Sequence, residues 1–387
     1  MPTIRPSARL QRLPPYLFAE LERKQRKLRE QGKDVIDISI GDPDQAAPER
    51  VREALVRHLR DKEIDTYPTT HGTDAFRVSV CEWMKRRYGV ELAMNQVLLC
   101  VGSKEVIAHA PLALTDPGDV VLIPEPGYPP YRSGTIFALA EPYVMPLQAK
   151  AGFLPDLDAI PPDIRKRARI LYVNYPNNPT GAVAPLDFYR RVVEFARKND
   201  VMVIADNAYG ELYYETPPVS FLSAPGASEV GIEIHSMTKS FNMAGWRIAW
   251  AVGNAQIIEI LRGFKANCDS GQFKAIQLAT AEVLRGGDKE METIRNVYRE
   301  RRDVFVQGMR AAGWDVQPPP ASIYVWFRTP GGLSSAAMTE RLLEEAHVVV
   351  TPGAGFGAHG EGFIRVALTE PATRLKEATA RIAGLKV

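Results

Sequence analysis

The chain has 387 residues, of which 45% are hydrophobic and 24% charged, a composition typical of a globular protein large enough for two domains. Its formal net charge of +2 gives no reason to expect a nucleic-acid partner or a membrane partner. The three cysteines, Cys81, Cys100 and Cys268, lie far apart, which argues against a disulfide framework and a zinc site and favours reduced thiols in a cytoplasm.

Three further features narrow the class of protein. The arginine-rich first 13 residues hold no apolar segment of the kind that a signal peptide needs. No apolar run approaches the roughly 18 residues that a membrane span requires. The six histidines do not stand at ligand spacings, so we expect no metal site.

The N-terminal region, up to residue 34, is a proline-punctuated arm followed by a predicted helix. Its basic run from Glu20 to Arg29 contains interspersed acids and apolar residues at helical spacing. This pattern favours a solvated helix face over a nucleic-acid patch. Gly32 follows the run, as a glycine that ends a helix does. A strand over 35–40 should then lead into a turn at Gly41.

The middle of the chain alternates apolar strands with helical patterns. We expect helices after Pro48 and over 74–88, 105–114 and 186–198, and strands over 97–101, 120–123, 170–173, 201–205, 231–235 and 248–252. Near-continuous apolar strands between helices predict an α/β fold with a mostly parallel central sheet flanked by helices. The polar motifs follow the strand ends, where open α/β sheets bind ligands.

The pattern changes after a long helix predicted over 288–312 and ended by Gly313. Short strands over 323–327, 348–350 and 363–368 mix with helices near 334–346 and 371–384. We therefore predict a large domain over 48–287. The connecting helix and a smaller α+β domain should occupy 288–387, with residues 1–47 as an arm contributing to the small domain.

One motif is a decoy. Gly355 to Gly360 matches the G-x-G-x-x-G pattern of dinucleotide-binding loops. That fingerprint must open a helix within a βαβ unit and be followed by an acid about 20 residues on. Here a predicted strand follows and the chain ends soon after. A glycine loop between strands is therefore favoured over an NAD site.

The stretch from Ser236 to Arg247 follows an apolar run and places one lysine, Lys239, among hydroxyl residues. A lysine at the end of a strand can form an imine with an aldehyde. The hydroxyls of Ser236 and Thr238 and the guanidinium of Arg247 suit a phosphate dianion. An aldehyde that carries a phosphate is pyridoxal 5′-phosphate (PLP). A lone lysine of this kind is more often a surface residue after an edge strand, so other parts of a PLP site are needed.

Other strand ends supply those parts. The ring nitrogen of PLP must stay protonated, which calls for a buried carboxylate, and Asp206 ends a predicted strand. Tyr209 and Asn178 are suitable hydrogen-bond donors to the ring oxygen. Tyr128, at another strand end, is a candidate to stack on the ring. Asp206 alone would equally fit a turn or a helix cap.

Two further sets of residues suit the two ends of a complex between PLP and an amino acid, the phosphate and the carboxylate. Ser103 and Lys104 open a predicted helix directly after a strand, so backbone N–H groups and the helix dipole can face a phosphate. Arg365 stands among apolar residues of a predicted strand, where an unpaired guanidinium is costly. A substrate α-carboxylate would explain it. The alternative is a structural ion pair.

Together these motifs resemble the fold-type I PLP aminotransferases of class I/II, the aspartate aminotransferase superfamily. The resemblance covers essentially the whole chain in the family's order and is carried by Lys239 with Ser236 and Arg247, Asn178-Pro179-Thr180-Gly181, Asp206 with Tyr209, and Arg365. It implies the PLP-dependent transferase fold, with a large and a small domain. It also implies amino-acid and oxo-acid substrates and a homodimer with shared active sites.

The resemblance assigns a role to each residue. It implies that Lys239 binds the cofactor aldehyde and later moves protons, that Asp206 pairs with the ring nitrogen, and that Tyr128 stacks on the ring. The remaining residues would bind the ring oxygen (Asn178, Tyr209), the phosphate (Ser103, Lys104, Ser236, Arg247), the substrate carboxylate (Arg365 and the backbone at Gly41) and the phosphate of the neighbouring subunit (Tyr67).

A narrower resemblance is to the bacterial LL-diaminopimelate aminotransferases. It is carried by residues 152–157, 174–184, 231–236 and 269–273. That group moves an amino group between LL-2,6-diaminopimelate and 2-oxoglutarate in lysine biosynthesis. This sequence has Thr238 where serine is commoner, and Ser240-Phe241 where Thr-Tyr is commoner. The resemblance implies that residues 69–71 and 270–274 read the distal end of the substrate.

Other functions remain open at this point. The substrate of an aminotransferase could instead be alanine, aspartate or an aromatic amino acid. A PLP-dependent C–S lyase on the same fold would begin with the same cofactor motifs. A PLP-binding transcription regulator would need a helix-turn-helix domain, and only about 34 residues precede the first predicted strand.

Overall fold

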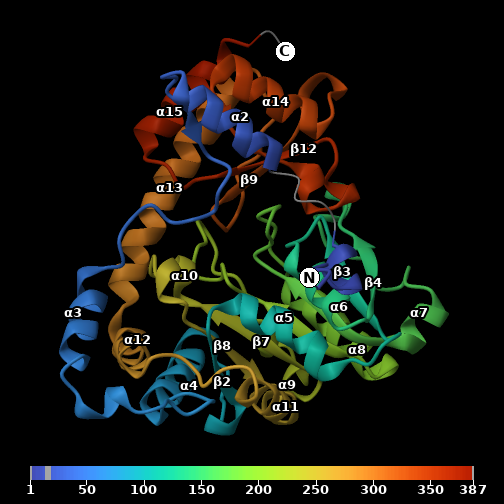
Figure 1. The fold of residues 1–387 in the computed structure, drawn as a ribbon, viewed down its shortest axis with the longest axis vertical. Helices are drawn as coiled ribbons and strands as arrows, with labels where there is room; N and C mark the ends of the chain where they lie inside the picture. The colour runs from blue at the N-terminus through green and yellow to red at the C-terminus, as the bar shows by residue number, and fades with distance from the viewer. Residues whose placement is uncertain (1, 14–18, 386–387) are drawn as a thin grey trace.

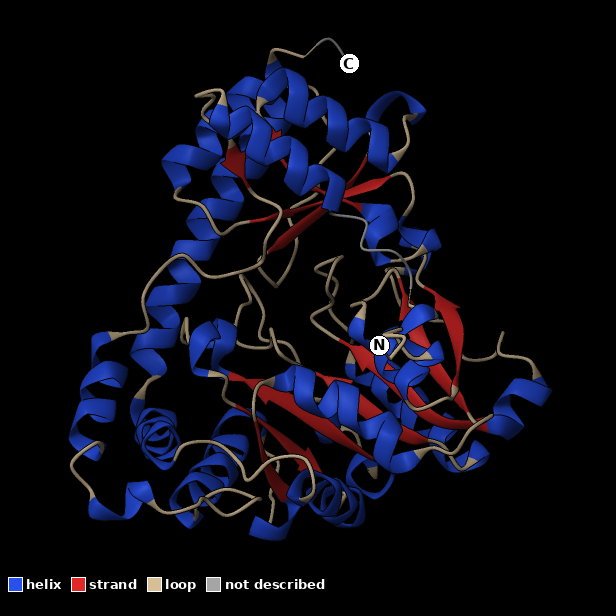
Figure 2. Ribbon diagram, viewed as in Figure 1, coloured by secondary structure: helices blue, strands red, loops and turns tan. Residues whose placement is uncertain are grey.

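A computed structural model describes residues 2–13 and 19–385 of the chain. A large sheet with its helices occupies the lower part of the molecule, a smaller layered part lies above it, and the long helix α13 runs between them (Figure 1). Figure 2 separates the two groups of strands clearly. The architecture is the α/β fold expected from the sequence.

The large sheet has seven strands in the order β2-β8-β7-β6-β5-β3-β4. Strand β8 is antiparallel to both neighbours, and the other strand pairs are parallel. The bounds are β2 Val97–Cys100, β3 Val120–Glu125, β4 Glu141–Pro146, β5 Ala168–Asn174, β6 Met202–Asp206, β7 Gly231–Ser236 and β8 Ala249–Gly253. The predicted mostly parallel sheet is confirmed. The edge strand β4 was not predicted, because only one of its six residues is buried and it lacks a continuous apolar run.

Helices cover both faces of this sheet because its strands are apolar on both sides. Leu99 belongs to the core shared with α4 and α8, whereas Leu98 belongs to the core shared with α5 and α11. Successive strand residues point to opposite faces, so one strand contributes to both cores. The helices of this part are α3 Glu49–His58, α4 Asp74–Tyr88, α5 Ser103–Leu114, α6 Pro130–Phe137, α7 Pro162–Arg167, α8 Leu186–Asn199, α9 Ala227–Val230, α10 Met237–Ser240, α11 Ala255–Ala266 and α12 Lys274–Gly286.

The smaller part has its own apolar core and its own short sheets. One sheet has the antiparallel order β11-β12-β9, and β1 pairs with β10 in the other. The elements are β1 Ile36–Asp37, β9 Tyr324–Arg328, β10 Val348–Val349, β11 Thr351–Pro352, β12 Phe363–Ala367, α2 Ala19–Glu30, α13 Asp288–Ala311, α14 Ser335–Ala346 and α15 Ala372–Ala383. The long helix and the mixed α+β pattern agree with expectation.

The predicted strand over 35–40 was too long. Only residues 36–37 form a strand. The carbonyl groups of Ser39 and Ile40 instead accept hydrogen bonds from side chains, at 2.6 Å from Arg365 and 2.8 Å from Thr369. Tertiary contacts therefore replace the sheet ladder at the end of this segment. The predicted strand over 348–350 is likewise too long: β10 ends at Val349, and a separate strand, β11, begins at Thr351.

The N-terminal arm touches both parts of the molecule. Helix α1, Ala8–Gln11, lies near α6 of the large part, where Arg9 donates to the carbonyl of Phe137 at 3.3 Å. Helix α2 lies against the small part, where Lys24 pairs with Glu344 at 3.0 Å. The division into 1–47, 48–287 and 288–387 stays a prediction.

The glycine loop at 355–360 forms 3-10 turns, η7 Gly353–Phe356 and η8 Ala358–Gly360, and leads into β12. It opens no α-helix, so it lacks the context of a dinucleotide site. The other 3-10 turns are η1 Lys62–Asp65, η2 Met94–Gln96, η3 Ala149–Ala151, η4 Phe221–Ser223, η5 Ala244–Trp246 and η6 Pro330–Gly332. Within residues 2–13 and 19–385, no helix is long and apolar enough to span a membrane.

Candidate active site

A cavity of about 820 Å³ lies where the carboxyl ends of the large sheet face the small part of the molecule. Its lining contains all but one of the site residues expected from the sequence: Gly41, Ser103, Lys104, Tyr128, Asn178, Asp206, Tyr209, Ser236, Lys239, Arg247 and Arg365. The exception is Tyr67, whose side chain is 87% exposed and lies outside this cavity.

The topology explains why these residues meet. Asp206 is the last residue of β6, and Ser236 is the last residue of its parallel neighbour β7. Asn178 follows β5, the neighbour of β6 on the other side. Parallel strands end at the same edge of a sheet, so polar residues just beyond them converge.

The end of the cavity near α5 is built for an anion. Gly102, the N-cap of α5, has φ of +77°, and the Arg247 guanidinium occupies the space that a Cβ there would need. The backbone N–H groups of Ser103 and Lys104, which open α5, and the positive end of the helix dipole face the same region, whereas the N–H of Glu105 already donates to the Gly102 carbonyl at 3.2 Å. Ser236 and Arg247 line the cavity beside this turn. A phosphate dianion fits this set of donors.

Lys239 stands on the short helix α10 directly after β7. Its ammonium donates to the carbonyl of Gly41. Burial lowers the pKa of Lys239 below its usual value, and the cations Arg365 and Arg247 add to this effect. A lysine with a lowered pKa more readily provides the neutral amine that acts as a nucleophile or a base.

Asp206 is 4% exposed, and burial raises its pKa to about 6. Its carboxylate accepts hydrogen bonds from the Tyr131 hydroxyl at 2.7 Å and from the backbone N–H of Ala208 at 3.2 Å. Tyr131 was missed from the sequence because it stands inside α6, where an aromatic residue is usually core. A cation beside Asp206 would hold the carboxylate in its charged form.

Arg365 comes from the centre of β12 and is 8% exposed. It donates to the side-chain oxygen of Asn178 at 3.0 Å and to the carbonyl of Ser39 at 2.6 Å. Its Nε atom has no hydrogen-bond partner. No carboxylate in residues 2–13 or 19–385 forms an ion pair with it, so the structural ion pair considered above is absent from the described chain. A carboxylate ligand would satisfy this guanidinium.

Tyr209 and Tyr324 place their hydroxyl oxygens 3.2 Å apart in the same cavity. Burial raises the pKa of Tyr209 well above its usual value. Burial also acts to raise the pKa of Tyr324, but Arg365, Lys239 and the hydrogen bond with Tyr209 together outweigh it and leave that pKa lowered. Sequence reasoning missed Tyr324, because it stands in the continuous apolar run Ile323 to Phe327 and resembles a core residue.

The family model described as Aminotransferase class I and II matches residues 33–382. The chain belongs to this family of aminotransferases. It is similar to the LL-diaminopimelate aminotransferase of Moorella thermoacetica, at 49% identity over 97% of this chain and 96% of that protein. The corresponding protein of Aquifex aeolicus is 48% identical, over 98% and 99%.

The fold of this aminotransferase is also that of a solved relative. A substrate-bound BacF structure from Bacillus subtilis matches with a TM-score of 0.95 and 35% identity, covering 100% of this chain and 99% of that one. The class I and II aminotransferases are in general PLP-dependent enzymes acting on amino acids and oxo acids. The cavity therefore lies where the family's chemistry requires a site, at the carboxyl edge of the large sheet.

Proposed function

We propose that this aminotransferase uses PLP in the cavity and exchanges an amino group between LL-2,6-diaminopimelate and an oxo acid such as 2-oxoglutarate. The observation that carries the proposal is the convergence of three groups on one cavity. These are the amine of Lys239, the buried carboxyl of Asp206 and the guanidinium of Arg365. An amino-acid complex of PLP needs each of them at a different point.

The residues present fit the cofactor. Its phosphate would lie at the first turn of α5, held by Ser103, Lys104, Ser236 and Arg247. Asp206 would face the ring nitrogen, with Asn178 and Tyr209 at the ring oxygen and Tyr128 on the ring face. When bound, PLP supplies an aldehyde for amines and an electron-withdrawing ring that stabilises negative charge at the substrate α-carbon.

The chain itself would bind the substrate and move the proton. Arg365, supported by Asn178 and the backbone at Gly41, would hold the α-carboxylate and so fix which face of the α-carbon meets Lys239. The neutral amine of Lys239 would take the α-proton and return it to the cofactor carbon. A second oxo acid would then reverse these steps, which gives ping-pong kinetics.

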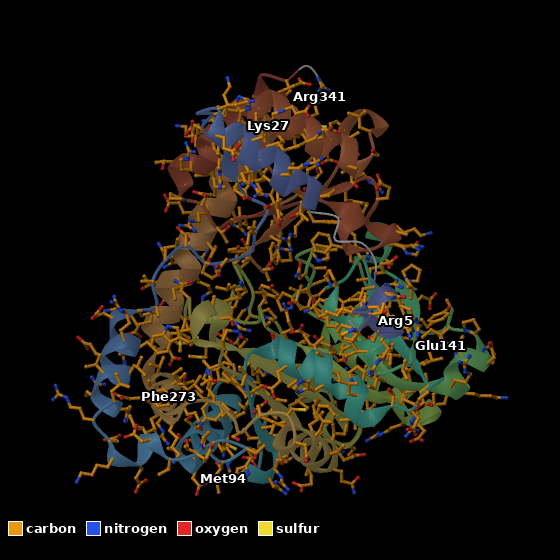
Figure 3. The ribbon with its side chains drawn as sticks, in the orientation of Figure 1. Arg5, Lys27, Met94, Glu141, Phe273 and Arg341 are labelled. Atoms are coloured by element: carbon orange, nitrogen blue, oxygen red, sulfur yellow. The ribbon has the colours of Figure 1, made fainter. Side chains whose placement is uncertain are left out.

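A homodimer with shared active sites is part of the proposal. Two aromatic side chains are left exposed, Tyr67 at 87% and Phe273 at 42%. Figure 3 labels Phe273 at the lower left of the large part. Lys274 donates to the carbonyl of Glu63 at 2.9 Å, so the segments around 67 and 273 lie together. A second copy would cover this patch and bring Tyr67 to the partner's phosphate. A cytoplasmic location stays a prediction from the cysteine content.

The substrate assignment is supported by the names of the relatives and by the motifs that resemble them. The loops at 69–71 and 270–274 would read the distal end of the substrate. Alanine, aspartate or an aromatic amino acid would be alternative donors. A C–S lyase on the same fold would release its product without an oxo-acid acceptor.

The test is an absorbance titration of the PLP-loaded protein with each amino acid in turn, without an oxo acid. A change in cofactor absorbance with LL-diaminopimelate alone, reversed by 2-oxoglutarate, is the expected result. A change only with alanine, aspartate or an aromatic amino acid would keep the transaminase and discard this substrate. No change in protein that holds PLP would favour the lyase, to be checked by assaying pyruvate and ammonia.

A further inference from the structure

Tyr324 is a buried side chain of the cavity to which the proposed reaction assigns no task. It begins β9 and is 4% exposed. Its partner across the small sheet is Ala367, two residues beyond Arg365 in β12. The tyrosine therefore enters the cavity from the same sheet as the guanidinium, opposite the wall that carries Lys239.

The ring of Tyr324 contacts the guanidinium of Arg365. The central carbon of that guanidinium lies 4.2 Å from the Tyr324 ring centroid, and 4.7 Å from that of Phe356 in the glycine loop. Such contacts attract a cation to the face of a ring and restrict the plane of the guanidinium. They act on Arg365 where its hydrogen bonds to Asn178 and Ser39 leave Nε unpartnered.

The hydroxyl of Tyr324 lies against two residues of the proposed site, Tyr209 and Gly41. It lies 3.2 Å from the Tyr209 hydroxyl. It also packs against Gly41 so closely that a Cβ there would overlap it, and the carbonyl of Gly41 accepts from Lys239. A tyrosine hydroxyl has one hydrogen to donate. If Tyr209 donated to Tyr324, it would have none left for a ligand in the cavity.

We infer that Tyr324 is a positioning residue for transamination: its ring holds the Arg365 guanidinium in plane, and its hydroxyl donates to Tyr209, which leaves the Tyr209 proton free for the cofactor oxygen. The inference rests on the proposed function. Burial raises the pKa of Tyr209. Burial also acts to raise the pKa of Tyr324, but the cations Arg365 and Lys239 and the contact with Tyr209 outweigh it, so Tyr324 is the more acidic hydroxyl and the better donor of the two.

Two substitutions separate the roles of the ring and the hydroxyl. Tyr324→Phe keeps the ring and removes the hydroxyl; Tyr324→Leu removes both. Tyr214→Phe is the matched control, since Tyr214 is also buried, bonds a carbonyl (Ser322, 2.5 Å) and has a guanidinium (Arg302) at 4.3 Å, but lies outside the cavity. The readouts are the pH midpoint of the bound cofactor's absorbance, the dissociation constant of PLP, and kcat and KM.

For Tyr324→Phe we expect kcat to fall about tenfold, the scale of one lost hydrogen bond, with KM for the amino acid nearly unchanged. The absorbance midpoint should rise, because a Tyr209 hydroxyl that no longer accepts a hydrogen bond from Tyr324 is less polarised and donates more weakly to the cofactor oxygen. Tyr324→Leu should in addition raise KM about tenfold through Arg365. Tyr214→Phe should leave the midpoint and KM as in the wild type.

An absorbance midpoint in Tyr324→Phe equal to that of the wild type would overturn the inference. A Tyr209→Phe/Tyr324→Phe double variant in which the two midpoint shifts simply add would also overturn it. If Tyr324 acts through the Tyr209 hydroxyl, removing that hydroxyl should abolish the shift caused by Tyr324→Phe. Thermal unfolding of each variant checks that the fold is retained, and Tyr324→His serves if the phenylalanine variant does not fold. A wild-type protein that binds no PLP would refute the proposed function instead.

Discussion

The two walls of the cavity are built in different ways. The wall on the large sheet takes its side chains from just beyond parallel strands, with Asp206 ending β6 and Ser236 ending β7. The wall on the small part takes Arg365 from the centre of β12 and a carbonyl group from Gly41, in a segment outside any strand. One wall is therefore set by the topology of a sheet, and the other by packing between distant segments.

This difference has a physical consequence. Groups at strand ends are fixed by a fully buried sheet and should change little when the two parts of the molecule move. Arg365 and Tyr324 depend on contacts that cross between parts, such as Arg365 with Asn178 at 3.0 Å. Substitutions on the first wall should affect cofactor binding and chemistry. On the second wall, loss of the Arg365 guanidinium or of the Tyr324 ring beside it should affect binding of the amino acid.

Lys239→Ala should give the largest effect, because it removes both the amine that bonds the cofactor and the base that moves the proton. We expect turnover to fall by at least about 10⁴-fold. Single-turnover absorbance changes with the amino acid provide the measurement. Lys85→Ala, a surface lysine paired with Glu91, is the control and should keep full rate. Full turnover in Lys239→Ala would contradict the assignment of Lys239 as the residue that bonds the cofactor and moves the proton.

Asp206→Asn should lower kcat/KM by about 10³-fold, since removing one partner of a buried charge pair costs roughly 4 kcal/mol. In the cofactor-free protein, the same variant tests whether burial raises the pKa of Asp206. The usual pKa of 3.8 becomes about 6 in the fold, so the folded protein binds the proton more tightly than the unfolded chain. The contribution of Asp206 to the free energy of unfolding is therefore most favourable below about pH 4. It falls by up to about 3 kcal/mol as the pH rises through 6.

Urea unfolding of the cofactor-free protein at pH 4.5 and 7 measures most of this loss, about two thirds of it. Asp206→Asn should show a smaller loss than the wild type, and Asp163→Asn, an exposed carboxylate in α7, should behave as the wild type. Equal pH slopes in Asp206→Asn and the wild type would show that the carboxyl group is not perturbed by burial.

The same contrast decides how much the sequence predicts. Asp206, Ser236 and the first turn of α5 could be placed because a residue after a buried strand has a known position in a parallel sheet. Tyr324 could not, since it lies in a continuous run of core residues and its hydroxyl meets that of Tyr209 only through a tertiary contact. The predicted strand over 35–40 failed for the same reason, because its carbonyl groups bond side chains from distant segments.

Arg365→Lys tests the second wall. An ammonium cannot bond Asn178, the Ser39 carbonyl and a carboxylate in the fork geometry of a guanidinium. We expect KM for the amino acid to rise about 10²-fold, with a smaller change in kcat. Arg302→Lys is the matched control, a buried arginine paired with Glu215 at 2.7 Å outside the cavity. A KM that stays at the wild-type value would show that the substrate carboxylate binds elsewhere.

Gly102→Ala, on the first wall, should have the smallest effect of these substitutions. Gly102 has φ of +77°, and a Cβ there would meet the Arg247 guanidinium at the proposed phosphate site. We expect the dissociation constant of PLP to rise about tenfold, from displaced donors and backbone strain together. Gly89→Ala isolates the strain, since Gly89 has φ of +67° and open space around it. It should lower the thermal midpoint and leave PLP binding unchanged. If both variants bound PLP as the wild type does, the first turn of α5 would not hold the phosphate, and this wall would lose its anion site.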